Sequence, residues 1–353
     1  MKRIVVPVAL VALSVLLTCA AAELVVRALW KDQTVMFPRY HTDYRYGAYT
    51  LRGIRPHSEF WHSSADGRWR FVTNGKGFRD TREFQYEKPA GTMRVLALGD
   101  SHTQGYEVRQ EATFSAVAER YLASHGVKAE VLNAGVSGYS TAEALAFLEN
   151  EGYKYQPDVV VLGFYANDLE DNLKAGLFAL EDGKLVEKKR EHIPGVRIQN
   201  LIYGLPGVRW LSENSYLYSV LFNGIWNYFK AATRDSAVDE VEYAIATRSA
   251  HSGYEVQLAV ALIERMQKFC DERGMRLIVI DIPRLTDRYR FAESIAPEAL
   301  QKGTMQVDLL SSRALFGNFS GAAELHVPRG HTHISELSHA LIGVAVGRRI
   351  LEK

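Results

Sequence analysis

Four residues far apart in the chain supply the chemical groups that acyl transfer at a serine requires. Such a reaction needs a nucleophile, a base that takes its proton, and hydrogen-bond donors aimed at the oxyanion. Ser101 provides the hydroxyl nucleophile and His333 provides the imidazole base. The backbone N–H groups of Ser101 and Gly138, together with the side-chain amide of Asn167, provide the donors. The sequence therefore predicts a serine-dependent acyl-transfer site.

Each of these residues also has a purely structural interpretation. Asp100 and Ser101 are residue types that often cap helices. Gly138 and Asn167 are types that often occur in turns. One residue type at one place is therefore weak support for catalysis, and the prediction depends on how the elements bring the four residues together.

The pattern of apolar residues predicts elements that would position this site. Residues 94–98 form a short apolar run of the kind found in strands buried on both faces, and the run ends in a Gly-Asp-Ser turn. Alternation of such runs with helical spacing predicts a parallel, doubly wound α/β sheet, whose ligands bind at the carboxyl ends of the strands. The predicted elements are strand 94–98, helix 111–124, strand 130–132, a helix from Thr141, strand 159–164, helix 255–273, strand 277–282 and helix 340–351.

Composition and charge exclude several classes of protein. The 353 residues carry a formal net charge of +1, so no basic excess favours nucleic acid. Cys19 and Cys270 are too few for a disulfide framework or a thiolate zinc site. A metal site at His331, His333 and His339 lacks an accompanying carboxylate or cysteine at a familiar spacing. No glycine-rich nucleotide loop follows the first strand. We therefore expect no metal, no cofactor and no nucleic-acid partner.

The N-terminus predicts export across a membrane. Lys2 and Arg3 precede an uncharged run over residues 4–22, which as a helix spans about 30 Å, the thickness of the hydrocarbon core of a bilayer. Basic residues before the run favour a cytoplasmic N-terminus. We expect residues 1–27 to be a signal anchor that crosses the inner membrane once, through residues 4–26, with the remainder on the periplasmic side. Cleavage as a signal peptide, or processing at Cys19 as a lipoprotein, would export the chain equally.

Two further stretches lack the α/β rhythm. Residues 28–90 show no sustained period and predict short strands and loops that pack on the main domain, residues 91–353. Residues 172–250 interrupt that domain and contain an aromatic, amphipathic segment. They predict a helical insertion that packs on the core, closes as a lid or rests on a membrane.

Four short blocks together resemble the SGNH, or GDSL, hydrolase superfamily. Their order along the α/β pattern matches, and the resemblance covers roughly residues 93–353 apart from the insertion. It implies a flavodoxin-like three-layer fold and the roles given above for Ser101, Gly138, Asn167 and His333. The blocks are Gly99-Asp100-Ser101-His102-Thr103, Asn133-Ala134-Gly135-Val136-Ser137-Gly138, Tyr165-Ala166-Asn167-Asp168 and His333 to His339.

The sequence departs from the superfamily pattern in two places. Tyr165 stands where members usually have glycine, which narrows the pocket and leaves the Asn167 amide intact. Gly330 stands three residues before His333, where members have the aspartate that orients the histidine. In serine proteases, replacing the corresponding aspartate by asparagine lowers turnover about 10⁴-fold.

Three compensations for the missing aspartate are open. A backbone carbonyl could orient His333 in a Ser-His dyad, or a carboxylate could come from elsewhere, such as Asp308 or Glu324. Alternatively the base is different: Glu336 precedes His339 by the usual three residues, and His331 is a further candidate. We favour His333, because the residues that follow it copy the superfamily's trailing pattern.

These observations predict an exported, membrane-tethered serine esterase. An element at Asn74 and Gly77-Phe78-Arg79 is similar to membrane-anchored members found with surface-polysaccharide genes. The resemblance implies removal or transfer of an O-acyl group, in particular O-acetyl, on a surface or secreted polysaccharide. The alternative is a carbohydrate-binding or assembly protein on the same fold with an impaired site. The oligomeric state is not predicted.

Overall fold

The central sheet has five parallel strands. The computed structural model describes residues 2–232, 253–287, 290–300, 307–317, 319, 322–329 and 333–352. The strand order in this sheet is β6-β5-β7-β11-β14, and every neighbouring pair is parallel. This order is that of flavodoxin-like folds, so the predicted doubly wound sheet is confirmed. The strands are β5 (Met93–Gly99), β6 (Ala129–Asn133), β7 (Val159–Phe164), β11 (Arg276–Asp281) and β14 (Asp308–Leu310).

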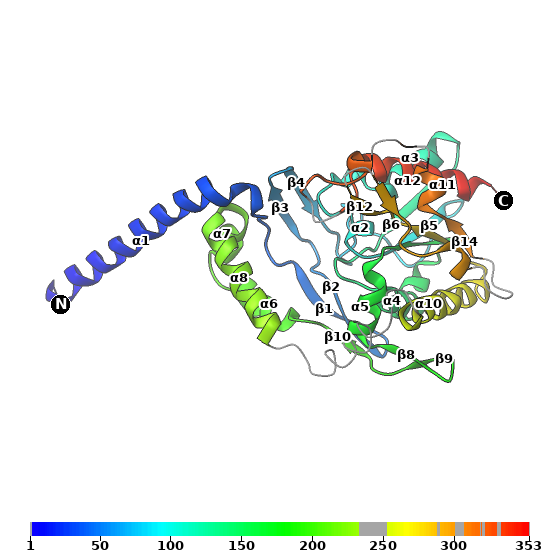
Figure 1. The fold of residues 1–353 in the computed structure, drawn as a ribbon, viewed down its shortest axis with the longest axis horizontal. Helices are drawn as coiled ribbons and strands as arrows, with labels where there is room; N and C mark the ends of the chain where they lie inside the picture. Colours follow the sequence, from blue (N-terminus) through cyan, green and yellow to red (C-terminus); the bar gives the residue numbers. More distant parts are fainter. Residues whose placement is uncertain are drawn as a thin grey trace.

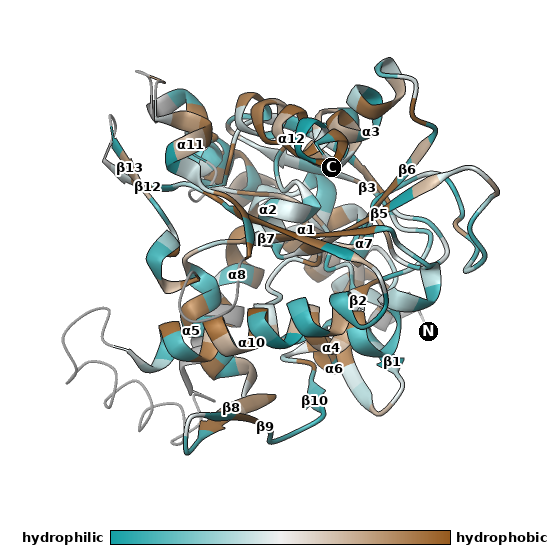
Figure 2. Cartoon of the chain, turned by 90° about the vertical axis from the view of Figure 1, so that its right-hand side faces the viewer, coloured by the Kyte–Doolittle hydropathy of each residue, from teal (hydrophilic) through white to brown (hydrophobic). Residues whose placement is uncertain are grey.

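Helices cover both faces of the sheet and complete three layers (Figures 1 and 2). Side chains alternate along β5: Val95 and Ala97 join an apolar cluster with α3 and α12, whereas Leu96 and Leu98 join a cluster with α4 and α10. Both faces of the sheet are buried, which explains why the strands are continuous apolar runs. The covering helices are α3 (Phe114–Ser124), α4 (Thr141–Asn150), α5 (Asn167–Ala175), α10 (Tyr254–Asp271) and α12 (Glu336–Leu351).

Helix starts differ from the sequence prediction where capping side chains set them. Residues Gln110–Ala112 form the 3₁₀ turn η2, and α3 begins only after Thr113, whose hydroxyl accepts from the Ala116 N–H. Helix α12 begins earlier than predicted, because the Ser335 hydroxyl accepts from the Ser338 N–H. The remaining short elements of this domain are α2 (Ser101–Gln104), η3 (Gly152–Tyr155), β12 (Arg284–Asp287), β13 (Arg290–Ala292), η4 (Pro297–Ala299), α11 (Ser312–Phe316) and η5 (Ala322–Leu325).

The N-terminal part consists of a projecting helix and two β-hairpins. Helix α1 (Lys2–Trp30) is long and apolar enough to cross a membrane, and it extends away from the rest of the molecule (Figure 1). After η1 (Lys31–Gln33), the hairpins pack on the α/β domain through contacts such as the edge of Tyr46 against Phe147, with ring centroids 5.0 Å apart. Their strands are β1 (His41–Tyr46), β2 (Tyr49–Ile54), β3 (Glu59–Ser64) and β4 (Gly67–Val72).

The stretch predicted as a helical insertion, residues 172–250, is helical only in part. It begins inside α5, and its described residues also form the hairpin β8 (Phe178–Glu181) and β9 (Lys184–Glu187) and the short strand β10 (Glu191–His192). Strand β10 pairs with β2, which joins this stretch to the N-terminal hairpins. The helices are α6 (Val196–Tyr203), α7 (Val208–Asn214) and α8 (Tyr216–Ala232), and residues 233–252 lie outside the described part.

Candidate active site

Ser101 begins a short helix directly after the inner strand β5. Gly99 ends the strand at a φ of 143°, and a side chain there would press on the Gly163 carbonyl oxygen and the Thr103 hydroxyl. Only glycine fits this turn. Asp100 then caps α2, because its carboxylate accepts from the His102 N–H at 2.8 Å. The turn leaves Ser101 half-buried at the carboxyl end of the sheet.

His333 lies within hydrogen-bond distance of Ser101. Its Nε2 is 2.9 Å from Ser101 Oγ, although 232 residues separate the two in the chain. A short antiparallel pairing holds the histidine: the Val327 N–H donates to the His333 carbonyl at 2.8 Å, and the Ser335 N–H donates to the Leu325 carbonyl at 2.9 Å. The structure therefore brings the predicted nucleophile and the predicted base together.

Two rings that the sequence analysis missed pack on the His333 imidazole. The ring centroids of Tyr106 and His102 lie 4.4 Å and 4.9 Å from that of His333. Burial lowers the pKa of His102 to about 3, so this neighbour is neutral at pH 7 and does not repel a protonated His333. Their only sequence signal is closeness to Ser101, because the turn at Gly105 keeps this segment beside the nucleophile.

The loop after β6 brings Gly138 to the end of β5. The Val136 N–H donates to the Gly99 carbonyl at 3.0 Å, so the loop continues along the strand that Ser101 follows. Gly138 has a φ of 79°, and its carbonyl accepts from the Arg52 guanidinium. Among the described residues, neither the Ser101 N–H nor the Gly138 N–H donates to a protein acceptor. Both predicted oxyanion donors therefore remain available.

Asn167 is the first residue of α5, and its side-chain amide faces two carboxyl groups. Its Nδ2 lies 3.2 Å from Asp100 Oδ2 and 3.0 Å from Asp171 Oδ2. The amide must release one of these contacts to reach an oxyanion. Burial raises the pKa of Asp100, Asp168 and Asp171. The Asp100 carboxylate raises the pKa of Asp168 and Asp171 further, whereas hydrogen bonds from His102 and Asn167 partly oppose the effect of burial on Asp100. A carboxyl that is more readily protonated opposes an oxyanion less.

The alternative base His339 is committed to a structural role. It is fully buried, and its Nδ1 accepts from the Phe114 N–H at 3.0 Å. Burial lowers its pKa to about 3. Glu336, its proposed partner, instead binds Arg109 at 2.6 Å through an exposed ion pair. The sequence hypothesis of a Glu336 and His339 pair at the site is therefore wrong.

The hypothesis that Asp308 orients His333 is also wrong. Its carboxylate forms ion pairs with Arg276 at 2.5 Å and with Arg349 at 2.8 Å. Arg276 begins β11, at the end of the sheet opposite to Ser101. Glu324 has an exposed side chain, and only its backbone carbonyl is bonded to this region, by the Ser335 hydroxyl at 2.5 Å.

Of the two positions at which the sequence departs from the superfamily pattern, the structure describes only Tyr165. Gly330 and His331 lie outside the described residues. Tyr165 is described, and its ring packs on His102 with centroids 4.0 Å apart. It therefore lies beside the ring that contacts His333, at the edge of the site.

The Asn74 to Arg79 element supports the turn that carries Ser101. The Arg79 guanidinium donates to the carbonyls of Gln104 at 2.8 Å, Gly105 and Val108 at 2.6 Å, at the end of α2 and in the turn that follows it. Asn74 Oδ1 accepts from the Phe78 N–H at 3.1 Å and so holds the loop that presents Arg79. Burial lowers the pKa of Arg79 to about 10, which leaves it charged at neutral pH.

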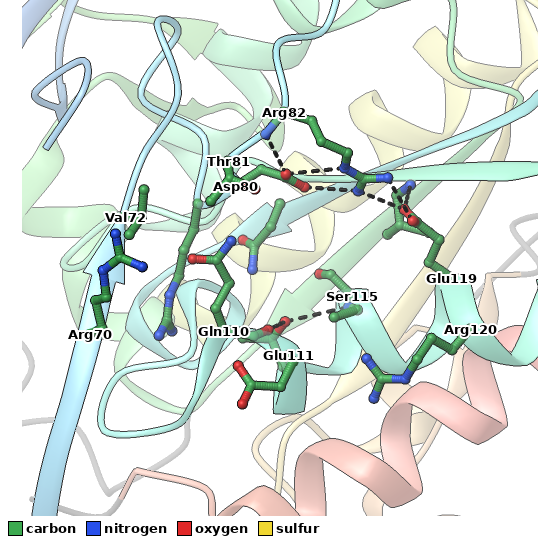
Figure 3. A pocket seen from close by; sticks show the side chains of 15 residues that line it. Arg70, Val72, Asp80, Thr81, Arg82, Gln110, Glu111, Ser115, Glu119 and Arg120 are labelled. Atoms are coloured by element: carbon green, nitrogen blue, oxygen red, sulfur yellow. Dashed lines mark hydrogen bonds and ion pairs between the residues drawn. The ribbon is translucent and has the colours of Figure 1, made fainter. Parts of the chain in front are cut away.

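Two cavities lie near these elements. A pocket of about 760 Å³ is lined by Ala166 and Leu169 on either side of the α5 start, and by Arg284, Ser294 and Arg313. A second, of about 370 Å³, lies between β4, α3 and β6, where Asp80 and Glu119 hold the Arg82 guanidinium (Figure 3). Neither Ser101 nor His333 lines the second pocket. Ser101, Asn167 and His333 do not line the first pocket either, but Ala166, the residue before Asn167, does.

Together, the parallel sheet and the Ser101 and His333 pair at its carboxyl end define a three-layer α/β protein with a serine–histidine site. A model of the GDSL-like lipase/acylhydrolase family matches residues 97–276, half of the chain, and the chain belongs to this family. The match contains Ser101, Gly138 and Asn167, whereas His333 follows it. The superfamily resemblance inferred from the four blocks is confirmed.

Individual relatives are more distant. An arylesterase of Vibrio mimicus is 33% identical over 75 residues, which are 21% of this chain and 38% of that protein. The chain thus spans well under half the length of this curated relative. A lipase/acylhydrolase from Enterococcus faecalis is 17% identical, with a TM-score of 0.41 over 73% of this chain and 95% of that chain. A two-domain esterase active on acetylated mannans is 11% identical, with a TM-score of 0.41 over 74% of this chain and 50% of that chain.

Proposed function

We propose that the protein is an ester hydrolase that acts through an acyl-serine intermediate. The observation that carries this proposal is the 2.9 Å contact between His333 Nε2 and Ser101 Oγ. A serine hydroxyl is a weak nucleophile by itself, and an imidazole at this distance can take its proton during attack. Family membership supports the same chemistry.

In the acylation step, Ser101 Oγ attacks the ester carbonyl while its proton passes to His333 Nε2. The N–H groups of Ser101 and Gly138 and the Asn167 amide hold the oxyanion, and each such donor contributes about 10²- to 10³-fold in rate. The tetrahedral intermediate then collapses: the bond to the alcohol oxygen breaks, and His333 returns its proton to that oxygen. The alcohol leaves, and the acyl group stays on Ser101.

In the deacylation step, water replaces the alcohol. His333 takes one proton from the water as its oxygen attacks the acyl-serine, and the proton returns to Ser101 Oγ when the acid leaves. If a sugar hydroxyl attacks instead, the same steps transfer the acyl group. A cleft that excludes water favours this outcome.

We propose O-acyl groups, in particular O-acetyl, on a surface or secreted polysaccharide as the substrate. The pocket of about 760 Å³ lined by Ala166, the residue before Asn167, has room for a sugar unit, and the guanidinium groups of Arg284 and Arg313 on its lining offer donors to sugar hydroxyl groups. We further propose that α1 anchors the protein in the inner membrane with the catalytic domain on the periplasmic side. The basic residues before the apolar run support this orientation.

Replacement of Ser101 tests the proposed function. Ser101→Ala should lower kcat/KM for a small acetyl ester by about 10³-fold or more, because it removes the atom that becomes acylated. A fluorophosphonate probe should label Ser101 in the unchanged protein and leave Ser101→Ala unlabelled. Ser124→Ala, which changes an exposed serine on α3, is the matched control and should keep both activities.

Two outcomes would contradict the proposal. Equal ester hydrolysis by the unchanged protein and by Ser101→Ala would exclude an acyl-serine route. Failure of the folded, unchanged protein to react with either ester or probe would favour the alternative, a binding protein with an impaired site.

A further inference from the structure

Helices α6, α7 and α8 and the loop between α6 and α7 carry a group of exposed apolar side chains. We call this group the apolar platform. In the described chain, large apolar side chains outside both α1 and this group are at most 40% exposed. An apolar group of this exposure on a water-soluble face is unfavourable unless something covers it. The platform consists of Ile198, Leu201, Leu205, Trp210, Leu221 and Ile225, which are 53% to 73% exposed.

Other side chains of the same helices are bonded to the N-terminal segment that contains the hairpins. On α8, Asn223 accepts from Arg39 at 2.6 Å, and Ser219 is buried. On α7, Glu213 accepts from the Trp61 N–H at 2.9 Å. On α6, Asn200 accepts from Arg55 at 2.8 Å. The exposed side chains therefore belong to a packed structure that presents them outward.

The last turns of α1 hold the start of α8. The Glu23 carboxylate accepts from the Ser215 hydroxyl at 2.8 Å and from the N–H groups of Tyr216 at 3.1 Å and Leu217 at 2.8 Å. Arg27 binds Glu23 at 2.7 Å and donates to the Asn214 carbonyl at 2.9 Å. Glu23 thus caps α8 although nearly two hundred residues separate them.

This connection fixes the level of the platform relative to the apolar run. Glu23 is the first charged residue after residues 4–22 and lies in the last turn of the expected span, residues 4–26, so it marks the level at which a membrane-spanning α1 approaches the bilayer surface. Figure 1 shows α8 crosswise to α1, with α6 to α8 between α1 and the sheet. A helix that begins at this level and runs crosswise to a spanning helix lies along the plane of the membrane.

We propose that the apolar platform rests in the interface of the membrane that α1 crosses, with lipid covering its side chains. This inference rests on the proposed anchoring by α1. Trp210 is the residue type that concentrates at membrane interfaces. Arg197 on α6 has a side chain that is 76% exposed and long enough to extend toward lipid phosphates. The platform and α1 together hold the domain in one orientation, so the Ser101 site keeps a fixed distance from the bilayer.

Fluorescence from single positions tests this proposal in the full chain. Cys19→Ser removes the exposed native cysteine, and Cys270 is buried. Leu201→Cys and Leu221→Cys would then carry the fluorophore NBD on the platform. Leu337→Cys, an exposed leucine on α12, is the matched control. Each labelled protein is placed in nanodiscs at one copy per disc, so that a second copy cannot cover the platform.

We expect the emission of both platform probes to shift to shorter wavelength in nanodiscs and to lose quenching by aqueous iodide, whereas the Leu337 probe changes in neither respect. Platform probes that stay as accessible as the control, in protein that resists carbonate extraction from vesicles, would overturn the platform and leave the anchor intact. A shift seen only at many copies per vesicle would assign the platform to self-association and also overturn the proposal. Release by carbonate would overturn the anchor and this inference together, whereas ester hydrolysis tests the Ser101 chemistry separately.

Discussion

Glu107 is a buried carboxyl residue with a strained backbone, and it directly follows Tyr106, whose ring packs on His333. It is a non-glycine residue with a φ of 58°, and its side chain is buried. His62 Nε2 lies 3.8 Å from its carboxylate, beyond hydrogen-bond distance, and the Tyr106 ring packs on the His62 ring with centroids 4.4 Å apart. Burial raises the pKa of Glu107 to about 7. Strained, buried polar residues of this kind persist only where the surroundings fix them.

The raised pKa of Glu107 predicts a pH-dependent effect of Glu107→Gln. The folded protein holds this proton up to about pH 7, whereas the unfolded chain releases it near 4.5. The wild type therefore loses stability relative to the variant as the pH rises from 4.5 through 7, and the loss is complete above that range. Such a shift corresponds to about 3 kcal/mol. Thermal unfolding in detergent at pH 5 and pH 9 measures it.

We expect Glu107→Gln to unfold at a clearly higher temperature than the wild type at pH 9, with the advantage much reduced at pH 5. Glu111→Gln, an exposed neighbour, is the control and should change neither value. An equal difference between Glu107→Gln and wild type at both pH values would mean that Glu107 is ionised throughout.

Sequence reasoning identified the residues of the site that follow strands and missed those that depend on packing. Ser101 and Asn167 were predictable because a buried parallel strand directs the next residues to the carboxyl edge of the sheet. Tyr106 and Glu107 carry no such pattern, because an N-terminal hairpin packs on them through His62 of β3, a contact distant in sequence. The choice between His333 and His339 likewise depends on tertiary packing, which buries His339 against Phe114 and leaves His333 beside Ser101.

At the scale of elements, the buried strands were predictable and the covering segments were not. β5, β7 and β11 are apolar throughout because both faces are buried, and this leaves a clear signal. β14 has only three residues, none of them fully buried, and its sequence therefore shows no such apolar signal. Stretches that pack on an already formed domain, such as β1 to β4, are stabilised by contacts distant in sequence, so local periodicity describes them poorly.

Arg79 shows how one such covering element reaches the site. Arg79→Met should remove three hydrogen bonds to the end of α2 and the turn that follows it, and leave buried carbonyls without partners. We expect a loss of about 3 kcal/mol or more in the free energy of unfolding. Because the Gly105 and Tyr106 N–H groups of the same turn donate to the Ser101 carbonyl, kcat should fall as well. Denaturant unfolding and ester hydrolysis measure the two effects.

Arg70→Met is the matched control for that experiment. Arg70 lies on β4 and forms an exposed ion pair with Glu59 at 2.6 Å. Exposed pairs contribute little, so its loss should cost under about 1 kcal/mol and leave kcat unchanged. If Arg79→Met behaves like Arg70→Met, the Asn74 to Arg79 element does not position the nucleophile.

At the scale of the whole molecule, the α/β domain, the hairpins and α6 to α8 form successive layers between the Ser101 site and α1. The three-layer domain followed from the sequence, because its alternating elements bury one another. The contact between α1 and α8 could not be predicted, because it joins residues distant in sequence. Ser215 caps α8 by accepting from the Tyr218 N–H, and its hydroxyl donates in turn to Glu23 of α1.

Glu23→Ala tests this connection. Removal of a helix cap costs about 1 kcal/mol, which corresponds to about five-fold faster local opening. We expect the N–H groups of Tyr216 and Leu217 to exchange with deuterium faster by about this factor in nanodiscs, because both lose their acceptor. Thr18→Ala, whose hydroxyl binds only its own helix at the Ser14 carbonyl, should leave this exchange unchanged. Unaltered exchange in Glu23→Ala would show that α8 is held without α1, and the level of the apolar platform would then be set by the hairpins alone.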